Sequence, residues 1–121
     1  MAHYPYRAPI DAYGNGGFRF AEMSHRGSLL ILADGMFGWD VSSAEDITLA
    51  AMQPIIARLA SPSFLLIGTG AVQVFPPLDV RQAFATAGIG LDPMSTGAAA
   101  RTYNVLLAEG RAVAAALIAV A

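Results

Sequence analysis

The fold class is decided by residues 61–70, which read SPSFLLIGTG. Two turn-forming triplets, residues 61–63 and Gly68-Thr69-Gly70, bound four consecutive apolar residues at positions 64–67. A short apolar run between turn signals is typical of a strand that is buried on both faces. We therefore expect residues 64–67 to form a central strand of a sheet that is covered on both sides.

Two helices are expected after this strand. Pro76-Pro77 opens a helical pattern that ends at Gly88, and Ser95 or Thr96 can cap a second helix over residues 97–109. Proline in the first turn and glycine just past the last are typical of helix termini. Serine and threonine are favoured at the N-cap because their hydroxyls accept a bond from a free backbone N–H.

Further strands are expected on both sides of this region. Residues 18–20 alternate between apolar and charged side chains, and residues 28–32 form a continuous apolar run. Each segment favours a strand, and the two strands are either separate or joined as a hairpin. Residues 39–41 and 89–91 indicate two short strands, whereas residues 113–120 fit a buried strand or a core helix. Strands that alternate with helices indicate an α/β domain with a parallel or mixed sheet.

An aromatic segment at residues 36–39 and a proline at position 54 need separate interpretation. Residues 36–39 are predicted to lie in a turn beside the sheet, with Trp39 buried as a core anchor. Ser43 precedes Asp46 by three residues, a weak capping-box pattern, and Pro54 follows. Because proline lacks a backbone donor and clashes with the preceding turn, we expect the helix to break at Pro54 or to begin anew there.

The composition fits one ordered domain. The 121 residues are 55% hydrophobic and 13% charged, and a chain of this size buries about two-thirds of its unfolded surface. We expect residues 1–121 to form a single domain. Residues 1–17, rich in Pro, Tyr and Gly, are expected to form an extended arm that ends in a turn at Asn15-Gly16-Gly17.

Charge and cysteine content exclude several classes of function. Seven basic and nine acidic residues are scattered, with a net charge of -2, so no basic stripe is available for nucleic acid. The absence of cysteine excludes disulfides, thiolate zinc sites and a cysteine nucleophile. Residues 1–10 lack the apolar core and the cleavage site of a signal peptide. The apolar run at residues 112–121 has about half the ~20 residues that a membrane-spanning helix needs. We expect a cytoplasmic protein that does not span a membrane.

No set of side chains forms a recognisable catalytic or metal centre. No serine lies in a nucleophile elbow, and His3 and His25 lack carboxylates at ligand spacing, which favours surface or strand-edge histidines. We therefore expect no catalytic residue, no metal and no cofactor. Glu109 is interpreted as a partly buried carboxylate in a structural ion pair with Arg101 or Arg111, or bound to a backbone donor.

Candidate binding residues come from two places. The Gly68-Thr69-Gly70 turn follows the central strand, where open α/β sheets offer backbone N–H groups to ligands, although a plain structural turn is the alternative. Arg101 and Asn104 share one helix face near a helix start that can attract an anion; alternatively, Ser95 only caps the helix and nothing binds. The candidate set is Gly68, Thr69, Gly70, Ser95, Thr96, Arg101 and Asn104.

Three motifs carry a resemblance to a known family: residues 65–70 (LLIGTG), 88–91 (GIGL) and 94–111 (MSTGAAARTYNVLLAEGR). They resemble the uncharacterised-domain family that includes the mitochondrial respiratory complex I (NADH:ubiquinone oxidoreductase) assembly factor three and many bacterial proteins of unknown function. Trp39, placed after the expected strand at 28–32, agrees with the resemblance, which covers roughly residues 10–121.

The resemblance implies a three-layer α/β fold: a mixed sheet of about five strands, one late strand antiparallel, with helices packed against it. It implies no established enzymatic activity, and an assembly role in the mitochondrial members. Ser95 stands where relatives commonly carry Asp, and Ala100 where many bacterial relatives carry Cys. Any mechanism that needs that carboxylate or thiol is therefore in doubt for this chain.

Two main functions follow. The first is a non-enzymatic protein-binding module that aids biogenesis or assembly of membrane or respiratory complexes, with their subunits as partners. The alternative is a small-molecule or anion-binding protein, or an enzyme, that uses a cleft between residues 68–70 and 95–104. A homo-oligomer with an apolar self-interface is the third interpretation. A deep polar pocket would favour a ligand, and an exposed apolar patch a partner. The residues expected to carry such a patch are Met36, Phe37, Trp39 and Phe75.

Overall fold

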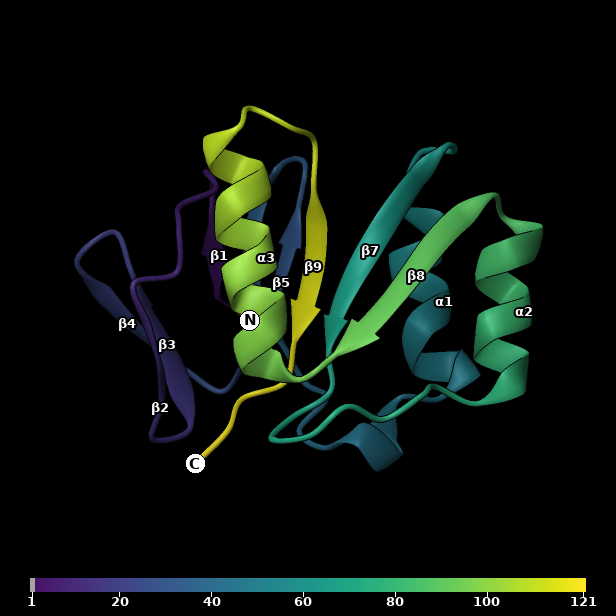
Figure 1. The fold of residues 1–121 in the computed structure, drawn as a ribbon, viewed down its shortest axis with the longest axis horizontal. Helices are drawn as coiled ribbons and strands as arrows, with labels where there is room; N and C mark the ends of the chain where they lie inside the picture. Colours follow the sequence, from purple (N-terminus) through teal and green to yellow (C-terminus); the bar gives the residue numbers. More distant parts are fainter. Residues whose placement is uncertain (1) are drawn as a thin grey trace.

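The computed structural model describes residues 2–121 and contains a six-stranded main sheet. Its strands are β1 (His3–Tyr4), β5 (Ser28–Leu32), β6 (Gly35–Trp39), β7 (Ser63–Gly68), β8 (Ile89–Met94) and β9 (Ala114–Leu117), in the order β1-β6-β5-β9-β7-β8 (Figure 1). β7 pairs in parallel with β8 and β9, whereas β5 pairs antiparallel with β6 and β9. The predicted mixed sheet is confirmed, with six strands in place of about five.

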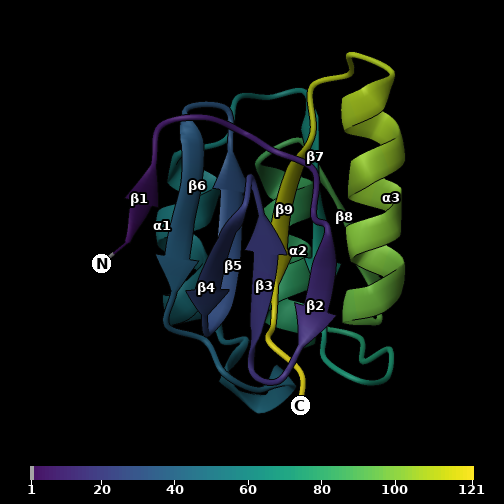
Figure 2. The ribbon, with the colours of Figure 1, turned by 90° about the vertical axis from the view of Figure 1, so that its left-hand side faces the viewer.

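A second, antiparallel sheet has three strands: β2 (Ala12–Gly14), β3 (Gly17–Phe20) and β4 (Met23–Arg26). Figure 2 shows it in front of the main sheet, with β2 beside helix α3 (Thr96–Ala108). Asn15 and Gly16 form the β2–β3 turn with φ of 51° and 79°, a backbone that matches the twist of a hairpin. The first 17 residues thus supply β1 and β2, and residues 18–20 pair within this small sheet instead of with β5.

The helices complete three layers. α1 (Leu49–Ala57) and α2 (Leu78–Thr86) cover one face of the main sheet, and α3 covers the other together with the small sheet (Figure 1). A short 3-10 helix, η1 (Ala44–Asp46), precedes α1. The expected α/β fold with helices packed on both sides of a mixed sheet is therefore confirmed.

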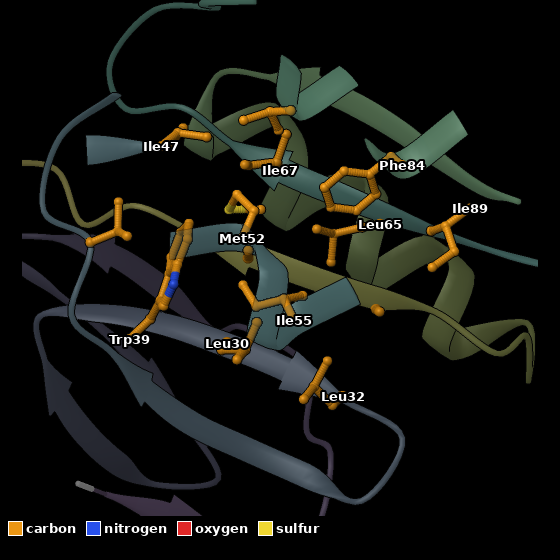
Figure 3. Close-up of a cluster of buried hydrophobic side chains, with 14 of the residues drawn as sticks. Leu30, Leu32, Trp39, Ile47, Met52, Ile55, Leu65, Ile67, Phe84 and Ile89 are labelled. Carbon is orange, nitrogen blue, oxygen red and sulfur yellow. The ribbon is translucent and has the colours of Figure 1, made fainter. Parts of the chain in front are cut away.

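Each face of the main sheet has its own hydrophobic core. On the side of α1 and α2, Met52 and Ile55 pack against Leu65 and Ile67 of β7 and against Phe84 of α2 (Figure 3). Trp39 belongs to this core and is only 8% exposed, which confirms its predicted burial. Because β7 contributes residues to both cores, its apolar character on both faces is explained.

The second core is centred on Tyr103 of α3, which is fully buried. Its neighbours include Phe18 and Phe20 from the small sheet and Leu66 from β7. The Tyr103 hydroxyl donates to the carbonyl of Ala8 at 2.8 Å. Burial raises the pKa of Tyr103 to about 12, and the positive charge of Arg7 opposes this with a smaller effect.

The predictions for residues 36–41 and for Pro54 were wrong. β6 ends at Trp39, so the strand expected at residues 39–41 does not continue beyond that residue. Residues 36–39 belong to strand β6, which pairs with β5 from Ser28↔Trp39 to Leu32↔Gly35, so they do not form a turn. Pro54 lies inside α1 and neither breaks nor starts it. The buried residues Met52 and Ile55 flank Pro54, and their packing on the sheet compensates for the one helix hydrogen bond that proline cannot make.

Candidate functional site

The carboxyl end of β7 meets the start of α3 through Thr96. The Thr96 side chain is fully buried; its Oγ1 donates to the carbonyl of Ile118 at 2.7 Å and accepts from the N–H of Gly70 at 3.0 Å. The Thr96 N–H donates to the Gly70 carbonyl at 2.8 Å. These bonds join β7, α3 and the segment after β9.

Glycine is required at two positions of this junction. A Cβ atom on Gly68 would lie 2.9 Å from Cα of Thr96 and 3.1 Å from a methyl carbon of Leu117, so Gly68 allows the helix to approach the sheet. Gly70 has a φ of 108°, which residues with a side chain rarely adopt. Both glycines therefore have a structural task in addition to any contact with a ligand.

Thr69 organises the loop that follows β7. Its Oγ1 donates to the Val72 carbonyl at 2.7 Å and accepts from the Val74 N–H at 3.0 Å. Gln73 donates from Nε2 to the Pro93 carbonyl at 2.8 Å, which ties the loop to β8. The loop and the first residue of α2 expose the apolar side chains Val72, Val74, Phe75 and Leu78, and these four residues are called the apolar loop below.

The start of α3 brings together Tyr13, Gly97 and Arg101, which could meet an anion. Ser95 is the N-cap, and its Oγ accepts from the Ala98 N–H at 3.3 Å. The Tyr13 hydroxyl lies against Gly97, and Nη1 of Arg101 comes within 3.4 Å of the position that a Gly97 Cβ would take. Within residues 2–121, Arg101 makes no ion pair. Arg101 therefore points back toward the helix start.

The other candidate polar residues of α3 contact the chain itself. Both polar groups of the Asn104 side chain bond to the backbone of Ile10. Glu109 and Arg111 approach each other at 4.0 Å, with side chains 55% and 61% exposed. The expected partial burial of Glu109 was wrong, because Glu109 is the C-cap that follows the last residue of α3 and is exposed to solvent. Exposed pairs of this kind contribute little to stability.

The two histidines have different surroundings. His25 is buried: its Nε2 lies 3.0 Å from the Ser28 carbonyl and its Nδ1 lies 3.1 Å from the Tyr4 hydroxyl. His25 lies on β4, an edge strand of the small sheet, so of the two predicted positions the strand edge is the one found, with the ring buried. His3 lies on the edge strand β1 and stacks on Phe37 at 4.4 Å. In the described part of the chain, no three His, Asp or Glu side chains gather as metal ligands.

A hollow of about 440 Å³ lies on the small sheet. Arg19 and Arg26 are among its lining residues, as are Gly14 and Gly17, and no Asp or Glu of residues 2–121 is among them. Arg19 donates to Ser24 Oγ at 2.8 Å. This hollow cannot be recognised in the sequence, because only the strand register places the two arginines on neighbouring strands.

The apolar loop was also only partly found. Phe75 was a candidate for an exposed patch, whereas Val72, Val74 and Leu78 were not. The signal was present in the sequence, because three large apolar residues within 72–75 stand outside any helical or strand pattern and directly before Pro76-Pro77. Of the other patch candidates, Met36 and Trp39 are buried and Phe37 is half-buried.

These features define a three-layer α/β domain with a six-stranded mixed sheet, a small antiparallel sheet and an apolar loop beside a helix start. The chain belongs to the DUF498/DUF598 family of proteins of unknown function. The model of this family matches residues 10–118. The predicted family membership is thereby confirmed. Among residues 2–121, every helix is too short or too polar to cross a lipid bilayer.

Three similar proteins illustrate the family. A crystal structure described as an outer membrane protein from Bartonella henselae is 50% identical, with a TM-score of 0.83 over 98% of this chain and 100% of that one. An uncharacterized protein of Rhodobacter capsulatus is 43% identical over 91% of this chain and 83% of its own length. NADH dehydrogenase (ubiquinone) 1 alpha subcomplex assembly factor 3 of Mus musculus is 29% identical over 98% of this chain, which spans 64% of the mouse protein.

Proposed function

We propose that this chain is a non-enzymatic, cytoplasmic protein-binding module that aids the assembly of a respiratory membrane complex, with NADH:ubiquinone oxidoreductase as the first candidate. The observation that carries the proposal is the apolar loop, in which four large apolar side chains within seven consecutive positions are exposed. Covering such side chains with a partner gains about 25 cal/mol per Å² of apolar surface. A contiguous apolar patch on a single chain is typical of a surface that binds a partner.

The similarity to the assembly factors supports the choice of complex assembly as the proposed role. The mouse protein carries that role in its name, and its similarity extends over nearly the whole of this chain. A shared fold alone would not transfer a function. The proposal therefore depends on a test in the cell.

The test is deletion of the gene in the organism that encodes this chain. We expect a lower level of assembled NADH:ubiquinone oxidoreductase on native gels and a lower rate of NADH-dependent quinone reduction in membranes, both restored by the gene on a plasmid. Succinate dehydrogenase in the same membranes is the control for general damage. An unchanged level of the assembled complex in the deletion strain would refute the proposed function.

A second candidate function is anion binding at the start of α3. Arg101 points back toward Gly97, where the Tyr13 hydroxyl also lies, and a helix start favours negative charge. Of the wider candidate set, Thr69, Gly70 and Thr96 use their side-chain or N–H groups within the chain. The anion would therefore meet Tyr13, Gly97 and Arg101.

The test of this candidate is a titration with phosphate and acetate, followed by backbone amide NMR. Saturable shifts confined to residues 95–99 are expected, and Arg101→Ala should abolish them. Arg111→Ala is the matched control, since Arg111 is an exposed arginine beyond the other end of α3. The absence of a saturable shift at millimolar anion would exclude this function.

A further inference from the structure

We propose that the apolar loop, together with the adjoining face of α2, is the docking surface for a short apolar segment of a client protein, bound in extended form beside β8. This inference rests on the proposed assembly function and names the surface that carries it.

The apolar loop exposes more apolar surface than isolated surface residues do. Val72 is 66% exposed, Val74 39%, Phe75 70% and Leu78 58%. Single exposed apolar residues are normal on soluble proteins. Four exposed apolar residues within seven consecutive positions are a local concentration of apolar surface, and such a concentration is typical of a site that binds a partner.

The loop is held in one conformation by polar contacts at both ends. Thr69 Oγ1 bonds to Val72 and Val74, and Gln73 bonds to the Pro93 carbonyl. At the other end, Arg81 Nε donates to the carbonyl of Pro76 at 3.0 Å. Because the loop is ordered before binding, a partner does not have to offset the entropy cost of fixing it.

The patch continues along α2 toward the edge of the sheet. Leu78, Arg81 and Ala85 recur at helical spacing, so they share one face of α2. Arg81 and Ala85 also line a hollow of about 460 Å³ whose other wall is formed by residues 88–91. Within residues 2–121, β8 pairs only with β7. Pro93 has no N–H and its carbonyl accepts from Gln73, so an added strand could pair with the outer edge of β8 only along residues 89–92.

The size of the surface favours a short segment over a second copy of this chain. Stable interfaces between folded partners bury about 800 Å² on each side and involve roughly 20–30 residues. The apolar loop and the hollow beside β8 comprise far fewer residues than that. A single extended segment, with side chains that alternate between the hollow and solvent, matches their extent.

The local charge favours a protein segment over a lipid surface. Residues 69–81 contain one acidic residue, Asp79, and one basic residue, Arg81, whose Nε bonds to the Pro76 carbonyl. Peripheral membrane binding generally combines an apolar face with basic residues that attract anionic lipids. With one acidic and one basic residue, residues 69–81 carry no net charge, which favours an apolar protein segment over an anionic lipid surface.

The first experiment places the photo-crosslinker p-benzoyl-phenylalanine at position 75 of the full chain in the organism that encodes it. The matched control carries it at position 105, because Val105 is also an exposed apolar residue, 56% exposed, on α3. We expect crosslinks from position 75, but not 105, to map to one apolar segment of another protein. Crosslinks to a second copy of this chain, to lipid, or equally from both positions would overturn the proposal.

The second experiment combines Phe75→Ser with Leu78→Ser. A synthetic peptide of the captured segment should bind the double variant at least about tenfold more weakly than the parent chain, a difference of about 1.4 kcal/mol, while Val105→Ser leaves binding unchanged. Both variants should unfold near the parent midpoint, since the exchanged side chains are exposed. Equal peptide binding by the double variant and the parent would overturn the proposal.

The two proposals fail in different ways. If gene deletion lowers the respiratory complex but the double variant restores it fully, the docking surface is wrong and the assembly function stands. If deletion has no effect on the complex but position 75 still captures one apolar segment, whose peptide loses affinity in the double variant, the docking surface stands and the assembly function is wrong.

Discussion

Asn104 of α3 holds Ile10 with both ends of its side-chain amide. Its Oδ1 accepts from the Ile10 N–H at 2.7 Å, and its Nδ2 donates to the Ile10 carbonyl at 2.8 Å. The two residues are 94 positions apart in the chain. Together with the bond from Tyr103 to the Ala8 carbonyl, this pair fastens the connection between β1 and β2 to the helix.

Asn104→Ala should therefore destabilise the fold. The substitution leaves the partly buried N–H and carbonyl of Ile10 without their protein partners. A buried backbone group without a hydrogen-bond partner lowers the unfolding free energy by about 1–3 kcal/mol. Denaturant unfolding should show this loss, whereas Val105→Ala, at an exposed position of the same helix, should change the free energy by no more than about 0.5 kcal/mol. Equal stability of both variants would show that water replaces the amide without loss.

Thr96→Val is expected to cost about 1–3 kcal/mol in unfolding free energy. Valine keeps the shape of threonine but removes the hydroxyl that bonds to the Ile118 carbonyl and the Gly70 N–H. Thr96→Ser keeps the hydroxyl and should lose only about 0.8 kcal/mol for the missing methyl group. If serine destabilises the protein as much as valine, packing of the methyl group matters more than the two hydrogen bonds.

Trp39→Ala should lower the unfolding free energy by about 3–5 kcal/mol, because it removes a large side chain from the core beneath α1 and leaves a cavity. Phe75→Ala removes a ring that is 70% exposed and should change stability by no more than about 0.5 kcal/mol. Thermal or urea unfolding distinguishes the two. A Trp39→Ala variant as stable as the parent would contradict the assignment of Trp39 to the core.

The pKa of Tyr103 predicts a loss of stability at alkaline pH. Burial raises this pKa from 10.0 to about 12 in the folded chain, so the folded state retains the proton more strongly than the unfolded state. The resulting stabilisation is complete below pH 10 and is lost as the pH rises from 10 through 12. Urea unfolding of the parent and Tyr103→Phe between pH 8 and about 11.5 measures it, as does tyrosinate absorbance. An identical alkaline decline in both would contradict the shift.

Helix ends and apolar strands were the features that local sequence predicted well. Ser95 caps α3 as expected, and Gly88 and Gly110, just past the ends of α2 and α3, both have a φ of 74°. Such signals can be read from the sequence because capping bonds and backbone preferences involve residues only a few positions apart. The central strand at residues 64–67 was recognised for a similar reason, since its turn signals adjoin it directly.

The wrong predictions depended on distant contacts. Pro54 stays inside α1 because Met52 and Ile55 pack on the sheet, and residues 36–39 form a strand because β5 and β1 pair with them on both sides. Residues 113–120 were compatible with a strand or a helix, and β9 forms because it lies between β5 and β7.

The sequence by itself determined the α/β class, the family resemblance and the limits of helices α2 and α3, because these depend on local patterns and on quoted motifs. Only the tertiary structure decided which side chains remain available to a partner. Thr96 and Asn104 carry polar groups of the same kind as many surface residues, yet packing directs them to Ile118 and Ile10. Phe75 and Leu78 are as apolar as any core residue, yet the positions of α2 and β8 leave no layer above them. Exposure is a property of the whole packed chain, so no local pattern specifies it.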